Sequence, residues 1–245
     1  MAIFVDTLIR GKSSSPFLLP SLFLILSWAM AKGMFIVFEG IDGAGTTTQT
    51  RMLVDRLTSD GHPARLTFEP SGGRIGKLIR DYLSGSIDIA DTDRHFHSLA
   101  LLFAADRLDH LSREVEPRLE KGDVVVSDRY LLSSLVYQSL HCDREWVVEI
   151  NREAVNPDIT FLLDLPVDMA MERLARRNLF KNDDIYETAE QQERIRELYV
   201  RSARELYSDQ EIIVLDGSAD PEIVHEKVMR KLRPDLKARA GADQE

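Results

Sequence analysis

The chain has 245 residues, a formal net charge of -10 at neutral pH and one cysteine, Cys142. Its length suits a single α/β domain with a sizeable core. The acidic balance argues against general nucleic-acid binding, which needs a basic surface. The lone cysteine excludes an internal disulfide and is typical of a reducing compartment such as the cytoplasm.

The first segment differs in composition from the rest. An apolar run over residues 17–30 ends at a site that resembles a signal-peptide cleavage site, although the run is short for a membrane span. A secretory signal or a marginal anchor is one interpretation. However, a predicted strand begins at Phe35, and Met30 or Met34 could be the true first residue. We expect an N-terminal extension over residues 1–33, of which residues 1–29 are an upstream artefact or a disordered appendage, with a membrane partner only if this segment is retained. We expect the domain to span 34–233.

Residues 35–49, FIVFEGIDGAGTTTQ, are the most informative stretch. An apolar run with strand character leads into a glycine-rich turn and then a helix rich in hydroxyls, which is the layout of a phosphate-binding loop. A chance glycine-rich turn is the alternative for the loop alone. On the first interpretation, ATP is bound by Gly40, Ile41, Asp42, Gly43, Ala44, Gly45, Thr46, Thr47 and Thr48.

The loop lacks its usual lysine. In the pattern G-x-x-x-x-G-K-[ST], Thr46 occupies the lysine position, whereas Thr47 keeps the hydroxyl that binds Mg²⁺. By analogy with removing one aimed donor from a site of developing charge, this substitution costs roughly 3 kcal/mol, or on the order of 100-fold in rate. An enzyme survives such a deficit if another cation takes the place of the lysine.

The segments after the loop alternate between helix and strand. The spacing predicts a helix over 46–58 and a short strand over 66–68. Glu69 follows this strand directly, at the edge where ligands of parallel sheets gather. Further helices are predicted over 76–83 and 93–119.

One pair on the second of these helices suggests base recognition. Phe103 and Arg107 lie four residues apart and share a face. An aromatic plate beside a guanidinium can stack a base and donate to its carbonyl. The alternative is a core phenylalanine with a surface arginine.

An apolar strand over 123–127 delivers Asp128 and Arg129 at its carboxyl end. An acid and an arginine at the tip of a buried strand are costly unless they bind something. A carboxylate linked to Mg²⁺ beside a phosphate clamp fits this pair. A structural ion pair between the two residues is the alternative.

The last third of the chain begins with a buried strand over 159–163, after which Pro166 opens a helix. A polar, acidic segment follows this helix, and we predict a lid over about 173–190 that closes over phosphates. A solvated charged face is the ordinary alternative. The cationic residues of this segment are Arg173, Arg176, Arg177 and Lys181.

The domain ends with a helix over 189–206, a strand over 212–215 and a helix from Asp220 to Pro234. We expect residues 234–245 to be a disordered tail. Strands that alternate with helices in this way predict an α/β fold, a five-stranded parallel sheet with helices on both faces.

Five segments, in this order and spacing, resemble thymidylate kinase: FEGIDGAGTTTQ, FEPSGG followed by GKLIR, LLFAADR, VVVSDRYLLSSLVYQ and FLLDLPVDMAMER. The resemblance covers Phe35 to about Leu232, and DRY-x-x-S-x-x-x-YQ after LLFAADR is highly specific to that family among phosphate-loop kinases. It implies a P-loop NTPase fold with a small lid, a homodimer, and transfer of the γ-phosphoryl group of ATP to dTMP, which makes dTDP with the help of Mg²⁺.

The resemblance also implies roles for the residues of the substrate site. Phe103 would stack the thymine, Arg107 would donate to a base carbonyl, and Tyr137 would lie under the deoxyribose. Ser134 and Gln138 would read the base or its neighbourhood.

Further roles concern the phosphates and the metal. Arg129 would hold the phosphate of dTMP, and Asp42 would meet the sugar 3′-hydroxyl and the water shell of the metal. Glu69 and Asp128 would complete the acidic, metal-side wall, and Thr47 with Asp128 would hold Mg²⁺.

The resemblance divides the family by the position of an extra cation, which lies in the phosphate loop or in the lid. Residues 41–44 include no arginine, so the lid type fits. We hypothesise that Arg177 takes over the missing charge. The predicted catalytic residues are therefore Asp42, Arg129, Arg173 and Arg177.

Two alternatives stay open, of which the first belongs to another class of protein. The first is a nucleotide-binding kinase relative that lost its chemistry with its lysine, and the retained acids and arginines argue against it. The second is a related kinase for a nucleoside or for another monophosphate.

Overall fold

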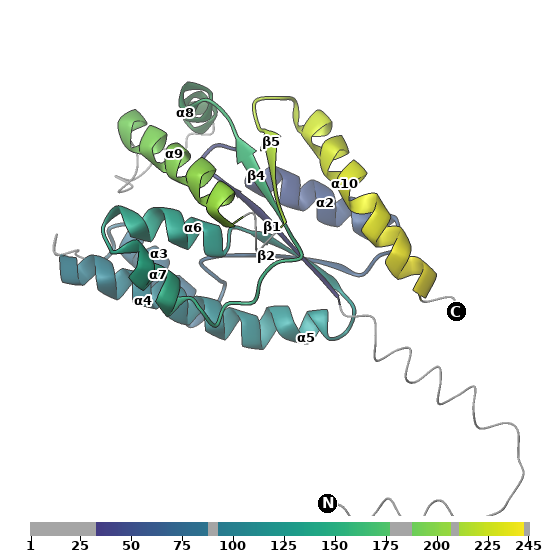
Figure 1. The fold of residues 1–245 in the computed structure, drawn as a ribbon, viewed down its shortest axis with the longest axis horizontal. Helices are drawn as coiled ribbons and strands as arrows, with labels where there is room; N and C mark the ends of the chain where they lie inside the picture. The colour runs from purple at the N-terminus through teal and green to yellow at the C-terminus, as the bar shows by residue number, and fades with distance from the viewer. Residues whose placement is uncertain (1–32, 88–92, 177–187, 207–210, 243–245) are drawn as a thin grey trace, which may run out of the picture.

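The computed structural model describes residues 33–87, 93–176, 188–206 and 211–242, which form a central sheet between two layers of helices (Figure 1). The predicted extension up to residue 32 lies outside the described residues. The same holds for residues 177–187 of the predicted lid, which include Arg177.

Five parallel strands form the sheet in the order β2-β3-β1-β4-β5. Every residue of the central strand β1 is buried, as its apolar run predicts. The predicted α/β fold with a five-stranded parallel sheet is confirmed. The strands are β1 Met34–Gly40, β2 Ala64–Phe68, β3 Val124–Asp128, β4 Ile159–Asp164 and β5 Ile212–Asp216.

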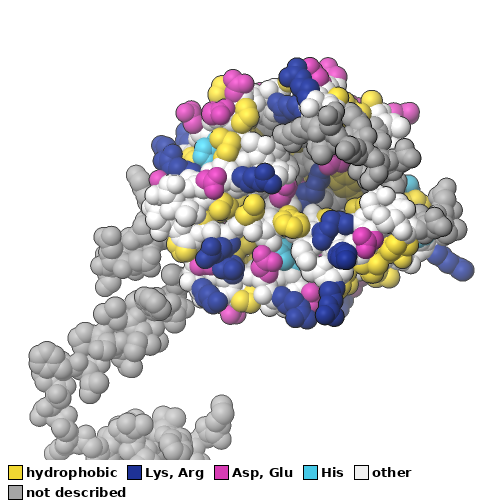
Figure 2. Space-filling view, turned by 180° about the vertical axis from the view of Figure 1, so that it is seen from behind, with side chains coloured by type: hydrophobic (Ala, Val, Ile, Leu, Met, Phe, Trp, Pro, Cys, Tyr) yellow, Lys and Arg dark blue, Asp and Glu magenta, His cyan; other side chains and the backbone are white. Residues whose placement is uncertain are grey.

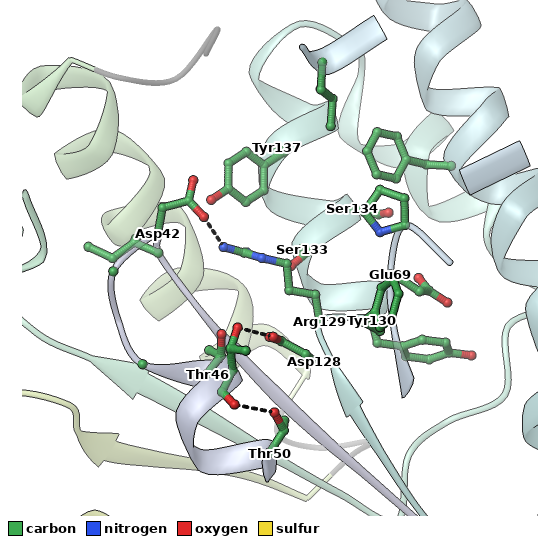
Figure 3. A pocket seen from close by; sticks show the side chains of 18 of the residues that line it. Asp42, Thr46, Thr50, Glu69, Asp128, Arg129, Tyr130, Ser133, Ser134 and Tyr137 are labelled. Carbon is green, nitrogen blue, oxygen red and sulfur yellow. Dashed lines mark hydrogen bonds and ion pairs between the residues drawn. The ribbon is translucent and has the colours of Figure 1, made fainter. Parts of the chain in front are cut away.

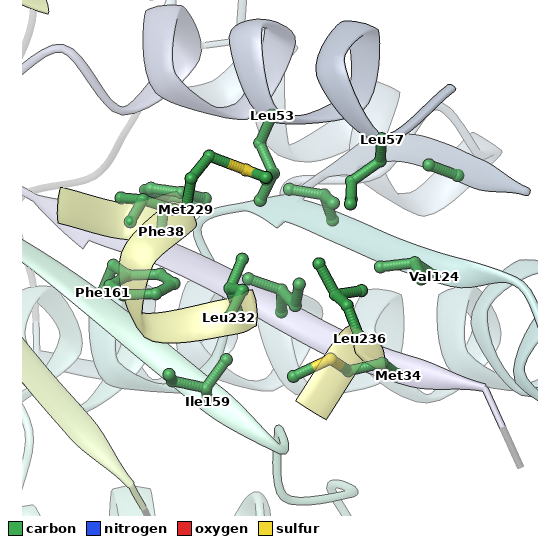
Figure 4. Close-up of a cluster of buried hydrophobic side chains, with 14 residues drawn as sticks. Met34, Phe38, Leu53, Leu57, Val124, Ile159, Phe161, Met229, Leu232 and Leu236 are labelled. Carbon is green, nitrogen blue, oxygen red and sulfur yellow. The ribbon is translucent and has the colours of Figure 1, made fainter. Parts of the chain in front are cut away.

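Two helices cover one face of the sheet, namely α2 (Thr46–Ser59) and α10 (Pro221–Ala242). Each presents an apolar stripe at helical spacing to the strands. Figure 4 shows side chains of both helices meeting over strands β1 and β4. The buried residues of this cluster include Phe38, Leu53, Leu57, Phe161, Met229 and Leu232.

The other face is covered mainly by α6 and α9 and by one long helical segment (Figure 1). The helix predicted over 93–119 is observed as α4, a π-helical turn η1 and α5 in direct succession. The remaining elements complete the domain at its edges. The other helices are α3 Arg74–Leu83, α4 Asp93–His110, η1 Leu111–Val115, α5 Glu116–Leu119, α6 Leu131–Tyr137, η2 Gln138–Leu140, α7 Arg144–Ile150, α8 Val167–Arg176 and α9 Ala189–Leu206.

Helix α10 does not end where the sequence predicts. It runs through Pro234 to Ala242, so the expected disordered tail over 234–245 is wrong up to residue 242. A proline inside a helix costs about 3 kcal/mol because one backbone hydrogen bond is lost. Leu236 is buried in the same core cluster as Met34, and burying a leucine stabilises by about 1.5–3 kcal/mol. This burial offsets much of the cost of the proline.

The strand order brings three chain segments together at one edge of the sheet. Phe38 of β1 and Phe68 of β2 both pair in register with Asp128 of β3. The loop after β1, Glu69 after β2 and Arg129 after β3 are therefore neighbours. The functional site is expected at this edge.

The surface carries a mixture of charges on the face that Figure 2 shows, where basic side chains are interspersed with acidic and hydrophobic ones. Within the described ranges, no helix combines the length and the hydrophobicity that crossing a membrane requires. The apolar run over 17–30 lies outside those ranges.

Candidate active site

A cavity of about 680 Å³ lies at the carboxyl ends of β1, β2 and β3 (Figure 3). Of the predicted site residues, Gly40, Ala44, Thr48 and Arg173 do not line it. The structure thus gathers most of the predicted site into one cavity. The predicted residues that line it are Ile41, Asp42, Gly43, Gly45, Thr46, Thr47, Glu69, Phe103, Arg107, Asp128, Arg129, Ser134, Tyr137 and Gln138.

The phosphate loop leaves the start of helix α2 open toward this cavity. Gly45 is the N-cap residue in the left-handed region, at φ 98°, where a residue with a side chain would be strained. No side chain caps the helix, and its first turn contains no acidic residue. The N–H groups at the start of this helix and the positive end of its dipole are therefore suited to an anion.

Helix α8 packs closely against the phosphate loop at Gly43. A Cβ atom at Gly43 would lie 2.5 Å from the carbonyl oxygen of Ala170, and Gly43 also has a positive φ of 84°. Only glycine allows this close approach. The predicted role of the glycines as conformational requirements of a phosphate loop agrees with this geometry.

Thr47 and Asp128 meet at the mouth of the loop. The hydroxyl of Thr47 donates to Oδ2 of Asp128 at 2.5 Å. The other oxygen, Oδ1, is buried and has no hydrogen-bond partner among the described residues. A hydroxyl beside an unsatisfied carboxylate oxygen is a hard oxygen donor set that fits Mg²⁺.

Arg129 has the least usual backbone of the site. Its φ is 70°, and a left-handed conformation costs a non-glycine residue roughly 1–2 kcal/mol. Its guanidinium donates to Asp42 at 2.5 Å and to the hydroxyl of Tyr199 at 2.8 Å, and it lies over the ring of Tyr137. Arg129 forms its ion pair with Asp42, and Asp128 accepts a hydrogen bond from Thr47. The alternative of an ion pair between Asp128 and Arg129 is therefore wrong.

The charge of Arg129 is secured by its surroundings. Burial lowers the pKa of this guanidinium, but Tyr137, Tyr199, Asp42 and Glu39 together raise it well above its ordinary value. Arg129 is therefore a permanent cation in the cavity.

Glu39 is a site residue that the sequence reasoning missed. Its side chain is fully buried in β1 and accepts hydrogen bonds from the backbone N–H groups of Tyr130 and Ser133 at 2.9 and 3.1 Å. It also accepts from the hydroxyls of Ser133 and Tyr199. Burial raises the pKa of Glu39, whereas the bonds from Ser133 and the charge of Arg129 lower it. Glu39, which lies in β1, thus caps the start of α6. It also fixes the segment before α6, which carries Arg129.

Arg107 is buried, with 1% exposure, so the alternative of a surface arginine is wrong. Its Nε and Nη2 groups donate to Glu69 at 3.0 and 2.8 Å. Nη2 also donates to Ser134 and to the carbonyl of Tyr130, and Nη1 donates to Asn151. Of the five guanidinium N–H groups, one on Nη1 is left without an acceptor among the described residues.

Glu69 lies elsewhere than expected. We expected it on the metal-side wall, but its Oε2 atom pairs with Arg107 and its Oε1 atom lies 3.2 Å from Nδ1 of His110. The hydroxyl of Thr67 lies 2.6 Å from the other ring nitrogen of His110. Because Glu69 and His110 are both buried, this chain of contacts holds the Arg107 guanidinium in one orientation.

The sequence offered uneven signals for these missed residues. Glu39 is an acid inside an otherwise apolar strand, which is a usable signal for a buried functional group. His110 lies three residues after Arg107 and therefore shares its helix face. Asn151 gave no signal, because its contact with Arg107 joins segments 44 residues apart.

The described lid arginines do not enter the cavity. Arg173 donates to the carbonyl oxygens of Gly217 and Ser218 at 2.8 and 3.3 Å. Arg176 pairs with Glu172 on the surface of α8. Arg177 lies outside the described residues.

Comparisons with known proteins identify the family of this chain. A family model described as thymidylate kinase matches residues 38–228. The chain belongs to the thymidylate kinase family. The family resemblance predicted from the sequence motifs is thereby confirmed.

Several relatives match over most of their length. The probable thymidylate kinase of Thermococcus kodakarensis is 43% identical over 201 residues, which are 80% of this chain and 95% of that relative. The probable thymidylate kinase of Thermococcus onnurineus is 40% identical over 83% of this chain and 98% of the relative. The putative thymidylate kinase of Treponema pallidum is 38% identical over 81% and 94%.

Proposed function

We infer that this protein transfers the γ-phosphoryl group of ATP to dTMP. The observation that carries this inference is that a single cavity joins an open phosphate loop to a buried, oriented arginine beside an aromatic ring. An oxygen of the dTMP phosphate attacks the γ-phosphorus, and the bond to the β,γ-bridging oxygen breaks, so that dTDP forms and ADP leaves. The acceptor phosphate is already ionised, so positioning and charge stabilisation suffice and no strong base is needed.

The base would bind at the end of the cavity that α4 and α6 form. We propose that Phe103 stacks on the thymine and that the free Nη1 N–H of Arg107 donates to a base carbonyl. Ser134 accepts from Arg107, so its own hydroxyl proton is available to a ligand. The Oε1 atom of Gln138 is buried with no partner among the described residues, so it can accept from the ring N–H.

The sugar and its phosphate would bind next to Arg129. We propose that Tyr137 lies under the deoxyribose, where a 2′-hydroxyl would clash. Arg129 would clamp the acceptor phosphate, and Asp42, which is half exposed and pairs with Arg129, would turn to the 3′-hydroxyl and to the water shell of the metal. Arg129 would then pair with Asp42 before dTMP binds and with the acceptor phosphate afterwards.

The polyphosphate of ATP would lie along residues 40–48, with its negative charge at the start of α2. We propose that Thr47 and Asp128 hold Mg²⁺, which when bound neutralises charge on the phosphoryl oxygens. The residues Gly40, Ala44 and Thr48 would shape the loop from outside the cavity.

The charge that the loop lacks would come in part from the lid. We propose that Arg177 approaches the transferred phosphoryl group when ATP binds. Arg173 is held by two backbone carbonyls, so in this role it would fix the base of the lid to the loop after β5. Arg177→Ala should lower kcat by about 10-fold or more if this is correct.

We also propose that the protein is a homodimer, as the resemblance implies, and that it works in the cytoplasm, a reducing compartment that its single cysteine suits. Exposed leucines on α3 and α4 support the proposal of a homodimer. Leu101 and Leu108 of α4 are 50% and 43% exposed, and Leu78 of α3 is 37% exposed. A second copy would bury these side chains. Leu101→Glu should shift the mass in analytical ultracentrifugation to that of a monomer, whereas a wild-type monomer would contradict the proposal.

The test of the reaction is a coupled assay of ADP release. We expect release with dTMP, much slower release with dUMP or dCMP, and none with thymidine, which lacks the acceptor phosphate. Equal rates with all three monophosphates would contradict the assigned base site. No release with any of them would contradict the reaction itself.

A further inference from the structure

The described cavity contains one cation that no part of the proposed mechanism uses. Its acidic lining residues are Asp42, Glu69 and Asp128, and its basic ones are Arg51, Arg107 and Arg129. The three negative and the three positive side-chain charges therefore balance before a nucleotide enters. ATP and dTMP then add several negative charges, so the state of each arginine decides whether the phosphates are stabilised.

Two of the three arginines are committed to protein partners. Arg107 is buried and is paired with Glu69 and Asn151. Arg129 is paired with Asp42 and Tyr199, and it is already assigned to the acceptor phosphate. Neither can serve as the mobile cation of the phosphate loop.

Arg51 is different. It is exposed, it lines the cavity, and no hydrogen bond or ion pair to a described residue involves it. It lies four residues after Thr47 on α2, so the two side chains share one face. Side chains on a helix lean toward its N-terminus, and an extended arginine is longer than one helical turn. The guanidinium of Arg51 can therefore reach back toward the mouth of the loop, where Thr47 and Asp128 lie.

We propose that Arg51 supplies part of the positive charge that the phosphate loop lost with its lysine. The site of Thr46 cannot carry charge, and the geometry offers Arg51 as the uncommitted cation on the neighbouring turn of α2. It would act on the γ-phosphate from the α2 side of the cavity, whereas a lid arginine would approach from the α8 side. The proposal rests on the binding of ATP at this loop, as proposed above.

The test is a rescue experiment on the full chain with four proteins: wild type, Arg51→Gln, Thr46→Lys and the double variant. Arg51→Gln should lower kcat about 30-fold, because one cation at an exposed position is lost, and should leave KM for dTMP within about twofold. Thr46→Lys should restore at least about 10-fold in the Arg51→Gln background. A purely structural role of Arg51 would not be rescued by a lysine in the loop.

The matched control is Arg56→Gln. It removes the same charge from the same helix, but Arg56 pairs with Asp60 and does not line the cavity. It should change kcat by less than about twofold. Arg51→Lys, which keeps the charge, should retain at least about a third of wild-type activity if charge is what matters.

Three results would overturn the proposal. The first is an Arg51→Gln variant with the kcat of wild type, and the second is an Arg51→Lys variant with a kcat as low as that of Arg51→Gln. The third is a double variant with the melting temperature of wild type in which Thr46→Lys does not restore kcat. These outcomes differ from a failure of the reaction. If wild type releases no ADP with dTMP, the proposed function fails. If wild type turns over normally and Arg51→Gln does so too, only the role of Arg51 fails.

Discussion

The two ends of the cavity are built differently. At the base end, Arg107, Glu69, His110 and Asn151 are buried and bonded to one another. At the phosphate end, helix α2 begins without a side-chain cap, one oxygen of Asp128 lacks a partner among the described residues, and the nearby Arg51 is uncommitted. At the first end the charged groups are paired with one another before a ligand arrives, whereas the second end leaves charge-binding groups open to a ligand.

This contrast predicts where each kind of mutation should be felt. Breaking the base end leaves a buried charge without its partner, so it should lower the stability of the whole protein. Changing the phosphate end removes groups that act on ligands, so it should lower activity and leave stability nearly unchanged. Variants at both ends can refute or refine this division.

The largest effect is expected for Arg129→Ala, because Arg129 joins the two ends. The loss of the phosphate clamp should lower kcat/KM for dTMP about 1000-fold, which corresponds to about 4 kcal/mol of transition-state stabilisation. Steady-state kinetics measures this. Arg152→Ala, at a solvent-exposed surface position, is the control and should change kcat/KM by less than about twofold. A loss below about tenfold for Arg129→Ala would rule out the clamp.

The next effect concerns stability at the base end. Glu69→Gln leaves the buried guanidinium of Arg107 without a counter-charge, so the free energy of unfolding should fall by about 3 kcal/mol. Urea denaturation measures it. Glu114→Gln, on the exposed side of His110, should cost less than about 0.5 kcal/mol. If the two variants are equally stable, the base end is not a pre-formed unit.

A smaller effect is expected at the metal ligands. Asp128→Asn should raise the Mg²⁺ concentration for half-maximal activity by about 10-fold or more, because a charged ligand becomes neutral. The melting temperature should stay within a few degrees of wild type. A Mg²⁺ titration of activity, paired with a melting curve, checks both. An unchanged Mg²⁺ requirement would contradict the assignment of Asp128.

The smallest effect is a pH dependence at Glu39. Burial raises the pKa of this carboxyl in the folded protein above its ordinary value of 4.5, so the folded state binds the proton more tightly than the unfolded state. The resulting stability is fully present below pH 4.5 and is lost as the pH rises through the raised pKa. The stability difference between wild type and Glu39→Gln should therefore fall with rising pH, by at most about 1.4 kcal/mol per pH unit. A stability difference that grows with pH would mean that the pKa of Glu39 is lowered rather than raised.

The part of the fold that the sequence predicts is the part that depends on local patterns. Apolar runs and turn residues indicate each strand within one or two residues, and the glycines of residues 40–45 indicate the phosphate loop. The end of α10 was not predictable, because the helix passes Pro234 only where the distant core buries Leu236.

The functional site was likewise predictable only where a local pattern indicates its residues. Residues next to strand ends, such as Asp128 and Arg129, could be identified because the carboxyl edge of a parallel sheet collects ligands. The contact between Glu39 and Tyr199 joins residues 160 positions apart, and no local pattern encodes it. The turning of Arg173 toward Gly217 is likewise a tertiary event.

Turnover by the unmodified chain is the decisive measurement. Purified wild-type protein is mixed with ATP, Mg²⁺ and dTMP, and dTDP is quantified beside the Thr46→Lys variant. We expect dTMP-dependent formation of dTDP by wild type, at a rate that the new lysine changes by no more than about threefold, because cations outside the loop already stabilise the phosphoryl group. Formation of dTDP by Thr46→Lys alone would show that the loop cannot work without its lysine.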